Sequence, residues 1–172
     1  MAKKNIGKDA GFATKSVHVG NDIDNETGAV RRPITMANSY ALPYDPTNVN
    51  WSEAGQNLYT RNGGANQQYL QEKLAAISNT EDAVVLATGV AALHSVFFTF
   101  LRSGDHVVAS NISYIAVYRL LNEYLPEKYN IEPTLVDTSN PEEVEKAIRS
   151  NTKLIHIETP GNPIVSISDI EA

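Results

Sequence analysis

The stretch "AVVLATGVAALHSVFFTF", residues 83–100, combines two different patterns. Its first part, Ala83–Ala87, is short, uninterrupted and rich in Val and Leu, which predicts a strand covered on both faces. From Val90 to Leu101 the apolar residues recur at helical spacing instead, which predicts a helix. The sequence therefore predicts a strand, a tight glycine turn at Thr88-Gly89 and a helix N-terminus in direct succession.

A phosphate group suits this junction. The first backbone N–H groups of a helix have no intrahelical partners, and they carry the positive end of the helix dipole. Because Gly89 has no Cβ that would hold a phosphate away, we predict that Thr88, Gly89 and Val90 bind one. From this segment alone, an ordinary turn between a strand and a helix remains the alternative.

Composition narrows the classes of partner. The chain has 172 residues, and its 14 Lys and Arg against 20 Asp and Glu give a net charge of −6, which argues against nucleic acid. No window approaches the roughly 18 consecutive apolar residues of a membrane span, and the N-terminus lacks the apolar core of a secretory signal. We therefore expect a cytoplasmic protein with no membrane partner. The chain has no cysteine, and no metal-ligand spacing relates its four histidines, His18, His94, His106 and His156.

Residues 1–61 are predicted to form an extended arm. Gly, Pro and Asn interrupt this segment every few residues, so no long periodic pattern develops. It is nevertheless too apolar for a free tail, and we expect it to lie across a neighbouring subunit of an obligate homo-oligomer. The apolar residues are Val30, Pro33, Ile34, Tyr40, Leu42, Tyr44 and Trp51.

Residues 62–172 show regular alternation of helical and strand patterns, which predicts an α/β domain with a parallel sheet. The predicted helices are one capped by Asn66 with Leu70, Leu74 and Ile77 on one face, one near Ile115–Tyr124, and Pro141–Arg149 capped by Asn140. The further strands are His106–Ser110, Thr134–Val136 and Lys153–Glu158. Ligands bind outside the carboxyl ends of such strands, so the residues that follow each strand are candidate site residues.

Four motifs line up along the chain: "YTRNGG" at 59–64, "ATGVAA" at 87–92, "SNISYIAVYRLL" at 110–121 and "IETPGNP" at 157–163. In this order and spacing the chain resembles the N-terminal part of the pyridoxal-phosphate (PLP) enzymes of cysteine and methionine metabolism. This family includes cystathionine γ-lyase, cystathionine γ-synthase, methionine γ-lyase and O-acetylhomoserine sulfhydrylase. The resemblance implies an extended arm followed by the first part of a mainly parallel-sheet large domain of the aspartate aminotransferase-like fold type I.

The resemblance also implies a function. Family members bind pyridoxal 5'-phosphate and carry out elimination or replacement on a sulfur amino acid or an activated homoserine, in transsulfuration and amino-acid biosynthesis. They assemble as homotetramers, each a dimer of dimers. We therefore expect a small-molecule amino-acid substrate, with lyase, synthase and sulfhydrylase activities left open.

Specific site residues follow from the resemblance. Tyr59 and Arg61 would grip the cofactor phosphate from the adjacent subunit, a role suited to a directional, always charged guanidinium. Tyr114 would stack on the pyridine ring and take part in proton transfer. Asn162 would present its amide to the ring hydroxyl, with Glu158 as its positioning partner.

Two residues that the family's chemistry requires are not found in this sequence. The family's chemistry needs a Schiff-base lysine and an Asp that pairs with the pyridinium nitrogen, and the resemblance implies that both lie beyond Ala172. A helix is predicted to begin at Ser168, and no lysine, Lys153 included, stands in a matching motif. We expect a fragment that is inactive by itself. A noncatalytic phosphate-binding paralogue is one alternative, and a dinucleotide-binding domain, for which the glycine pattern is lacking, is another.

Overall fold

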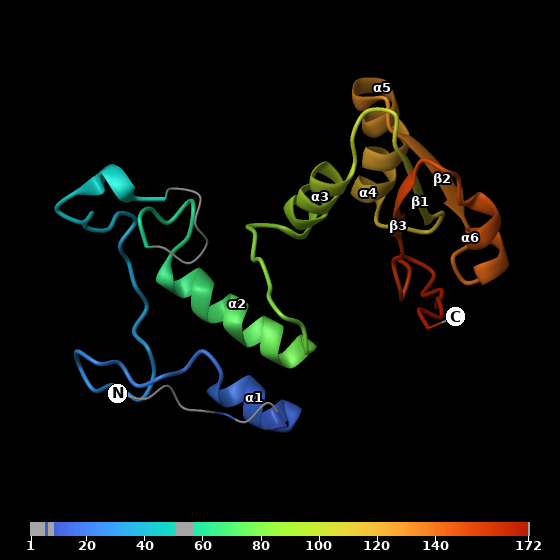
Figure 1. Ribbon diagram of the computed structural model, residues 1–172. Coiled ribbons are helices and arrows are strands. Elements are labelled where there is room, and N and C mark those ends of the chain that lie inside the picture. Colours follow the sequence, from blue (N-terminus) through green and yellow to red (C-terminus); the bar gives the residue numbers. More distant parts are fainter. Residues whose placement is uncertain (1–5, 7–8, 51–56, 172) are drawn as a thin grey trace. The chain divides into compact units, whose positions relative to one another are not determined.

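The computed structural model describes residue 6, residues 9–50 and residues 57–171 (Figure 1). The chain divides into two compact units, Met1–Val85 and Leu86–Ala172. Among the described residues, every helix is too short or too polar to span a bilayer. The predicted boundary between arm and large domain at residue 61 stays a prediction.

The described residues of the N-terminal unit form two α-helices and one short 3₁₀ turn. They are α1 (Phe12–His18), the 3₁₀ turn η1 (Pro46–Asn48) and α2 (Ala65–Ser78). Most of the described part of the predicted arm is irregular, but α1 forms in a run free of Gly and Pro and packs against α2. Trp51, one of the apolar arm residues, lies outside the described residues.

Asn66 does not cap α2, which corrects the prediction. Gly64 is the N-cap residue, and no side chain caps the helix there. The Asn66 side chain instead accepts a hydrogen bond from the Thr35 N–H at 3.0 Å and donates one to the Thr35 carbonyl at 2.8 Å. A primary amide offers a donor and an acceptor together, so it can satisfy both backbone groups of one extended residue.

Ala83–Ala87 does not form the predicted strand. Val84 and Leu86 are 77% and 41% exposed, and no strand pairs with this segment within the described residues. Its Val85 N–H donates to the Gln71 side-chain oxygen at 3.2 Å instead. A strand needs the backbone groups of a neighbour, and an apolar sequence pattern cannot supply that neighbour.

The C-terminal unit is built on a three-stranded sheet in the order β2-β1-β3. Both strand pairs are parallel, as predicted, and the central β1 matches its predicted bounds. The strands are β1 (His106–Ser110), β2 (Glu132–Val136) and β3 (Thr152–His156). The helices are α3 (Gly89–Phe100), α4 (Ile115–Arg119), α5 (Leu125–Tyr129) and α6 (Pro141–Ala147), with a π-helical turn η2 (Leu120–Tyr124) between α4 and α5.

Helices cover both faces of this sheet (Figure 1). His156 of β3 contacts Phe97 of α3, whereas the preceding Ile155 lines a groove with residues of α6. Because consecutive strand residues point to opposite faces, α3 and α6 lie on opposite sides. The buried core lies on the α3 side and consists of Phe97, Leu101, Val107, Ala109, Val117, Leu120, Leu121, Leu125 and Ile131.

Three helix predictions in this unit differ clearly from the structure. The helix predicted near Ile115–Tyr124 continues through η2 and α5 to Tyr129. The predicted cap at Asn140 is confirmed, since its side chain accepts from the Glu142 N–H, but α6 ends at Ala147. No helix begins at Ser168, because residues 168–171 take an irregular path in which the buried Ser168 hydroxyl bonds to Thr138.

A buried histidine at the start of β1 bonds to both neighbouring strands. The Nδ1 atom of His106 lies 2.7 Å from the Thr152 hydroxyl, and its Nε2 atom lies 2.8 Å from the Thr134 hydroxyl. Burial, helped by the nearby Arg149, lowers the pKa of His106. A neutral imidazole has one donor and one acceptor, which two hydroxyl groups can satisfy.

Candidate active site

Glu158 joins two other predicted site residues, Tyr114 and Asn162, at the carboxyl end of the sheet. Its Oε2 atom accepts a hydrogen bond from the Tyr114 N–H at 2.9 Å, and its Oε1 atom accepts one from the Asn162 N–H at 3.1 Å. Tyr114 lies in the connection from β1 to α4, and Asn162 lies in the turn after β3. One carboxylate therefore joins the segments that follow two neighbouring strands.

The same two segments approach closely at Gly161. A Cβ atom on this buried glycine would lie 3.1 Å from the Ile112 side chain and 2.6 Å from the Ser166 hydroxyl. The Gly161 N–H also donates to the Ser166 carbonyl at 2.8 Å. The turn after β3 is thus packed against the loop after β1 as well as bonded to it.

The side chains that these segments carry are accessible. Tyr114 is 47% exposed, and Asn162 is exposed as well. Within the described residues, neither the Tyr114 hydroxyl nor the Asn162 amide has a hydrogen-bond partner. Their polar groups are free to meet a ligand, while Glu158 holds their backbones.

The start of α3 offers free backbone donors beside open space. Thr88 caps the helix, because its hydroxyl accepts from the Ala91 N–H at 3.1 Å. The helix ladder begins with the bond from the Ala92 N–H to the Thr88 carbonyl, so the N–H groups of Gly89 and Val90 have no acceptor among the described residues. A Cβ on Gly89 would meet nothing within 4 Å. These features suit an anion.

Tyr59 and Arg61 form a local pair in the N-terminal unit. The Arg61 guanidinium carbon lies 5.0 Å from the centre of the Tyr59 ring, and both side chains are exposed. The Tyr59 carbonyl accepts from the N–H groups of Asn62 and Gly63, which closes a tight turn at this point. The two residues could act together, whereas the other predicted site residues belong to the C-terminal unit.

His156, at the end of β3 and two residues before Glu158, is a half-buried titratable group to which the sequence patterns assigned no role. Its ring packs edge-on against Phe97 at a centroid distance of 5.4 Å, and its Nε2 atom is buried without a partner among the described residues. Burial lowers the pKa of His156 and favours the neutral ring. Nothing in the local pattern distinguishes this histidine from an ordinary core residue.

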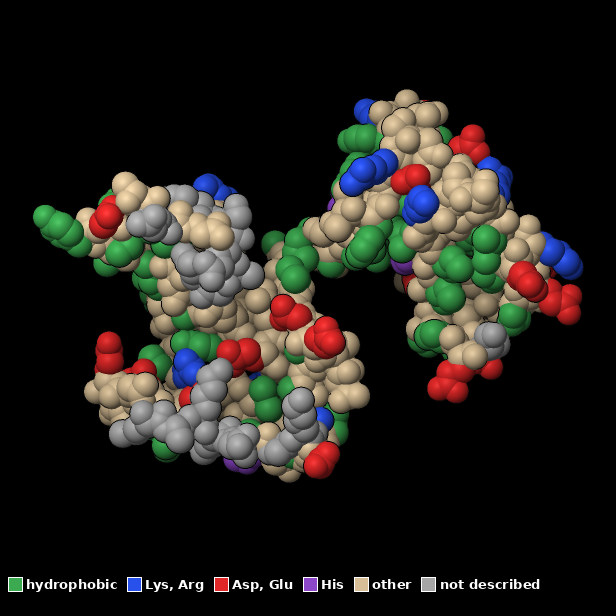
Figure 2. All heavy atoms as spheres, viewed as in Figure 1, with side chains coloured by type: hydrophobic (Ala, Val, Ile, Leu, Met, Phe, Trp, Pro, Cys, Tyr) green, Lys and Arg blue, Asp and Glu red, His purple; other side chains and the backbone are tan. Residues whose placement is uncertain are grey.

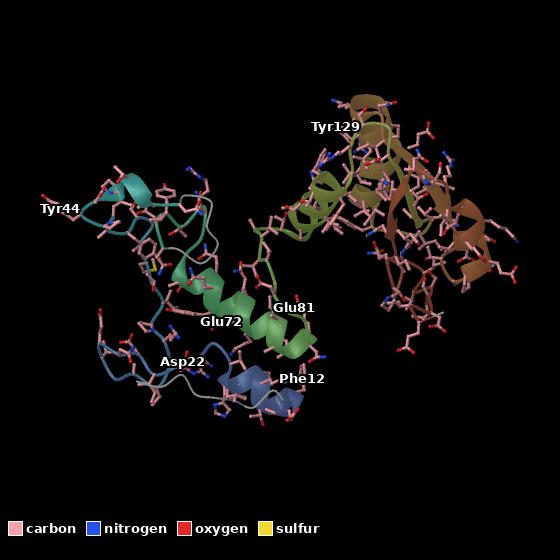
Figure 3. The ribbon with its side chains drawn as sticks, viewed as in Figure 1. Phe12, Asp22, Tyr44, Glu72, Glu81 and Tyr129 are labelled. Atoms are coloured by element: carbon pink, nitrogen blue, oxygen red, sulfur yellow. The ribbon has the colours of Figure 1, made fainter. Side chains whose placement is uncertain are left out.

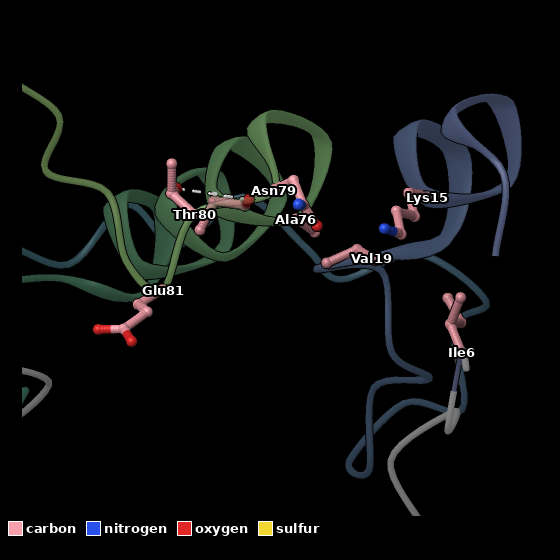
Figure 4. A pocket seen from close by; sticks show the side chains of 8 residues that line it. Ile6, Lys15, Val19, Ala76, Asn79, Thr80 and Glu81 are labelled. Atoms are coloured by element: carbon pink, nitrogen blue, oxygen red, sulfur yellow. Dashed lines mark hydrogen bonds between the residues drawn. The ribbon is translucent and has the colours of Figure 1, made fainter. Parts of the chain in front are cut away.

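A separate groove lies in the N-terminal unit. It has a volume of about 550 Å³, lies between α1 and α2, and contains none of the predicted site residues (Figure 4). Lys15, Val19, Asn79 and Thr80 are among the residues that line it. Within the described part of the chain, no cluster of three or more His, Asp or Glu side chains could hold a metal ion.

The family model described as "Cys/Met metabolism PLP-dependent enzyme" matches residues 13–172. The chain belongs to this family. It is 58% identical over 161 residues to a canavanine gamma-lyase of Rhizobium leguminosarum bv. trifolii, covering 94% of this chain and 40% of that protein. It is 38% identical over 176 residues to an L-methionine gamma-lyase of Porphyromonas gingivalis, covering 100% of this chain and 43% of that protein.

A solved structure agrees with these relatives. The crystal structure of metB from Corynebacterium glutamicum matches with a TM-score of 0.85 at 36% identity, over 95% of this chain and 41% of that chain. The match confirms the predicted fold class. The chain thus spans about 40% of the length of the relatives it matches.

The groups described at this site fit pyridoxal 5'-phosphate, the cofactor of the family, and the motifs predicted this cofactor. Free N–H groups at the start of a 12-residue helix suit its phosphate. An exposed tyrosine ring suits its flat pyridine, and an unpaired side-chain amide suits its ring hydroxyl.

Proposed function

We propose that this chain forms the cofactor-binding N-terminal part of a PLP-dependent γ-lyase. The supporting observation is the difference between its relatives, since identity is 58% to a canavanine γ-lyase and 38% to a methionine γ-lyase. Because the chain spans only about 40% of these relatives, the activity belongs to the complete gene product.

The proposed substrate is an amino acid that carries a leaving group on its γ-carbon, and canavanine is the first to test. When bound, the cofactor supplies an electron sink for negative charge that develops on the substrate carbon chain. The protein's own residues bind and orient it. In this proposal the Gly89 and Val90 N–H groups and the Thr88 segment hold the phosphate, and Tyr114 stacks on the ring.

Tyr114 has a second proposed role. Its hydroxyl is free of protein partners within the described residues, and it lies on the side chain that stacks on the ring in this proposal. A phenol so placed can accept or donate a proton at its Oη atom during elimination. Asn162 would orient the ring through its side-chain amide.

Tyr59 and Arg61 are proposed to complete the site from a neighbouring subunit of a homotetramer. The guanidinium would pair with two phosphate oxygens, and the phenol would add a hydroxyl donor. The exposed position of both residues is compatible with this role. If Arg61 acts across the boundary, an Arg61→Ala subunit mixed with a Tyr114→Ala subunit leaves one intact site in each mixed dimer.

The decisive experiment offers canavanine, methionine, cystathionine, and O-acetylhomoserine with sulfide, each to the complete gene product with its cofactor. Mass spectrometry follows the loss of each amino acid and its products. We expect canavanine to be consumed fastest. Preferred consumption of methionine or cystathionine would reject the substrate, reaction only with sulfide would indicate a sulfhydrylase, and no reaction with bound cofactor would indicate a noncatalytic paralogue.

Subunit exchange tests the oligomeric part of the proposal. Mixing the Arg61→Ala and Tyr114→Ala proteins should recover part of the activity that each lacks alone. A mixture that stays inactive despite proven mixed dimers would show that Arg61 does not act in trans.

A further inference from the structure

We infer that Glu158 is a positioning residue that sets the distance between Tyr114 and Asn162, the two residues proposed to meet the cofactor ring. This inference rests on the proposed function and adds the means by which two separate loops present their side chains together. Glu158 acts through the backbone of both residues and need not touch the cofactor.

The bonding pattern carries the inference. Each carboxylate oxygen serves one partner, with Oε2 on the Tyr114 N–H at 2.9 Å and Oε1 on the Asn162 N–H at 3.1 Å. The two donors are 48 residues apart in sequence, and only the sheet brings their loops together. Charge-assisted bonds of this kind are roughly twice as strong as neutral ones, so a single side chain can hold both loops.

The position of Glu158 in the chain helps it to hold both loops. It follows the end of β3 at His156, so the paired strand anchors its backbone. The Ser110 hydroxyl donates to the Ile112 carbonyl at 2.8 Å, which fixes the opposing loop to the end of β1. Glu158 therefore spans two loops that are each tied to a neighbouring strand.

Close packing at Gly161 supports the same reading. Since a Cβ there would lie 3.1 Å from the Ile112 side chain, the turn after β3 lies as near to the β1 loop as a glycine permits. The turn is also tied to the segment that follows it, because the Thr159 hydroxyl accepts from the Ser168 N–H at 3.1 Å. The contacts leave little freedom in the turn, and Glu158 adds the direct link to Tyr114.

The side chains of Tyr114 and Asn162 show why such a link matters. Neither has a hydrogen bond from its own polar group within the described residues, so the protein orients these groups mainly through their backbones. Loss of the Glu158 carboxylate would let the two backbones separate while the strands stay paired.

The experiment compares the complete gene product with its Glu158→Gln, Glu158→Asp and Glu158→Ala variants. Gln keeps the length but only one acceptor oxygen, whereas Asp keeps the charge but is one methylene shorter. Glu145→Gln, at an exposed carboxylate on α6, is the matched control. Amide hydrogen exchange is measured on the cofactor-free protein, and affinity is measured by titration with pyridoxal 5'-phosphate.

We expect Glu158→Ala to speed exchange at the Tyr114 and Asn162 amides by about 10-fold or more and to weaken cofactor affinity by about 10-fold, with β1 and β3 amides unchanged. Gln should release one of the two amides, Asp should not restore both, and the control should match the parent. These local changes, together with the loss of affinity, would support a positioning role.

Three results would overturn the inference, and they can be told apart. Unchanged exchange at both amides would show that Glu158 does not tie the loops. Faster exchange with unchanged affinity would leave Glu158 a purely structural tie. In both cases the proposed function would stand, whereas failure of the parent protein to bind the cofactor at all would reject the proposed function together with the inference.

Discussion

The C-terminal unit buries large apolar side chains such as Phe97, Leu121 and Leu125, whereas the apolar residues buried in the described part of the N-terminal unit are only Ala65 and Ala75. Figure 2 shows hydrophobic side chains exposed on both units. In the arm they include Val30, Ile34, Met36 and Tyr44, and Tyr44 projects from the ribbon in Figure 3.

Polar contacts join the described part of the arm to α2. The Arg32 guanidinium pairs with Asp22 at 2.5 Å and lies 4.1 Å from the centre of the Tyr69 ring. Asn66 bonds both backbone groups of Thr35. Burial of apolar area is the main favourable term in folding, so a unit whose described residues bury no large apolar side chain needs another surface to cover its apolar side chains. This difference between the units supports the proposal that the arm packs on a neighbouring subunit.

The largest expected effect tests the core itself. Leu125 is fully buried, so Leu125→Ala should lower the free energy of unfolding of the C-terminal unit by about 2–5 kcal/mol through lost burial and a residual cavity. The matched change Leu70→Ala, at a side chain that is 48% exposed on α2, should cost much less. Denaturant unfolding measures both, and equal losses would remove the contrast between the units.

A smaller effect is expected where the arm touches α2. Gly20 has a φ of +71°, and a Cβ there would lie 2.5 Å from the Tyr69 carbonyl oxygen. Gly28 has the same φ but open space around it, which makes it a matched control for backbone strain alone. Each change to Ala should cost about 1–2 kcal/mol for the positive φ, and Gly20→Ala should cost more because of the clash. Limited proteolysis of the arm would report the difference, and equal susceptibility would show that this contact does not hold the arm.

Acid should weaken the C-terminal unit selectively. Burial lowers the pKa of both His106 and His156, so the folded state binds fewer protons than the unfolded state. The stability that these two neutral histidines contribute is fully present above the unfolded pKa of about 6.5. It is lost as the pH falls through their lower folded pKa values. Thermal unfolding between pH 8 and pH 5 measures this (about the range in which histidine titrates). His106→Gln and His156→Gln should each remove part of the pH dependence, and an unchanged profile in both variants would contradict the assignment.

The smallest effects are expected on α6. Lys146 and Glu142 form an ion pair at 3.8 Å, and both side chains are more than three-quarters exposed. Lys146→Ala should therefore change stability by less than about 0.5 kcal/mol. Asn140→Ala removes a helix cap and should cost about 1 kcal/mol, which makes it the positive control for the same helix. A larger loss at Lys146 than at Asn140 in thermal unfolding would reverse this order.

Features with a local cause were predictable from the sequence. The apolar run of β1, the cap at Asn140 and the helix that follows Thr88 depend on neighbouring residues, so their patterns located them. The motifs around Tyr59, Gly89, Tyr114 and Asn162 indicated the family, which the family match confirms. The roles of these residues in cofactor binding stay predictions.

Only the tertiary structure decided which distant groups meet. The Asn66 side chain pairs with Thr35, 31 residues away, although its position before a helical pattern favoured a cap. Glu158 reaches Tyr114, 44 residues away, as well as the nearby Asn162. Ala83–Ala87 has the composition of a strand but no partner among the described residues. Periodicity and capping describe what a segment can form by itself, whereas a strand partner or a shared carboxylate depends on where the rest of the chain folds.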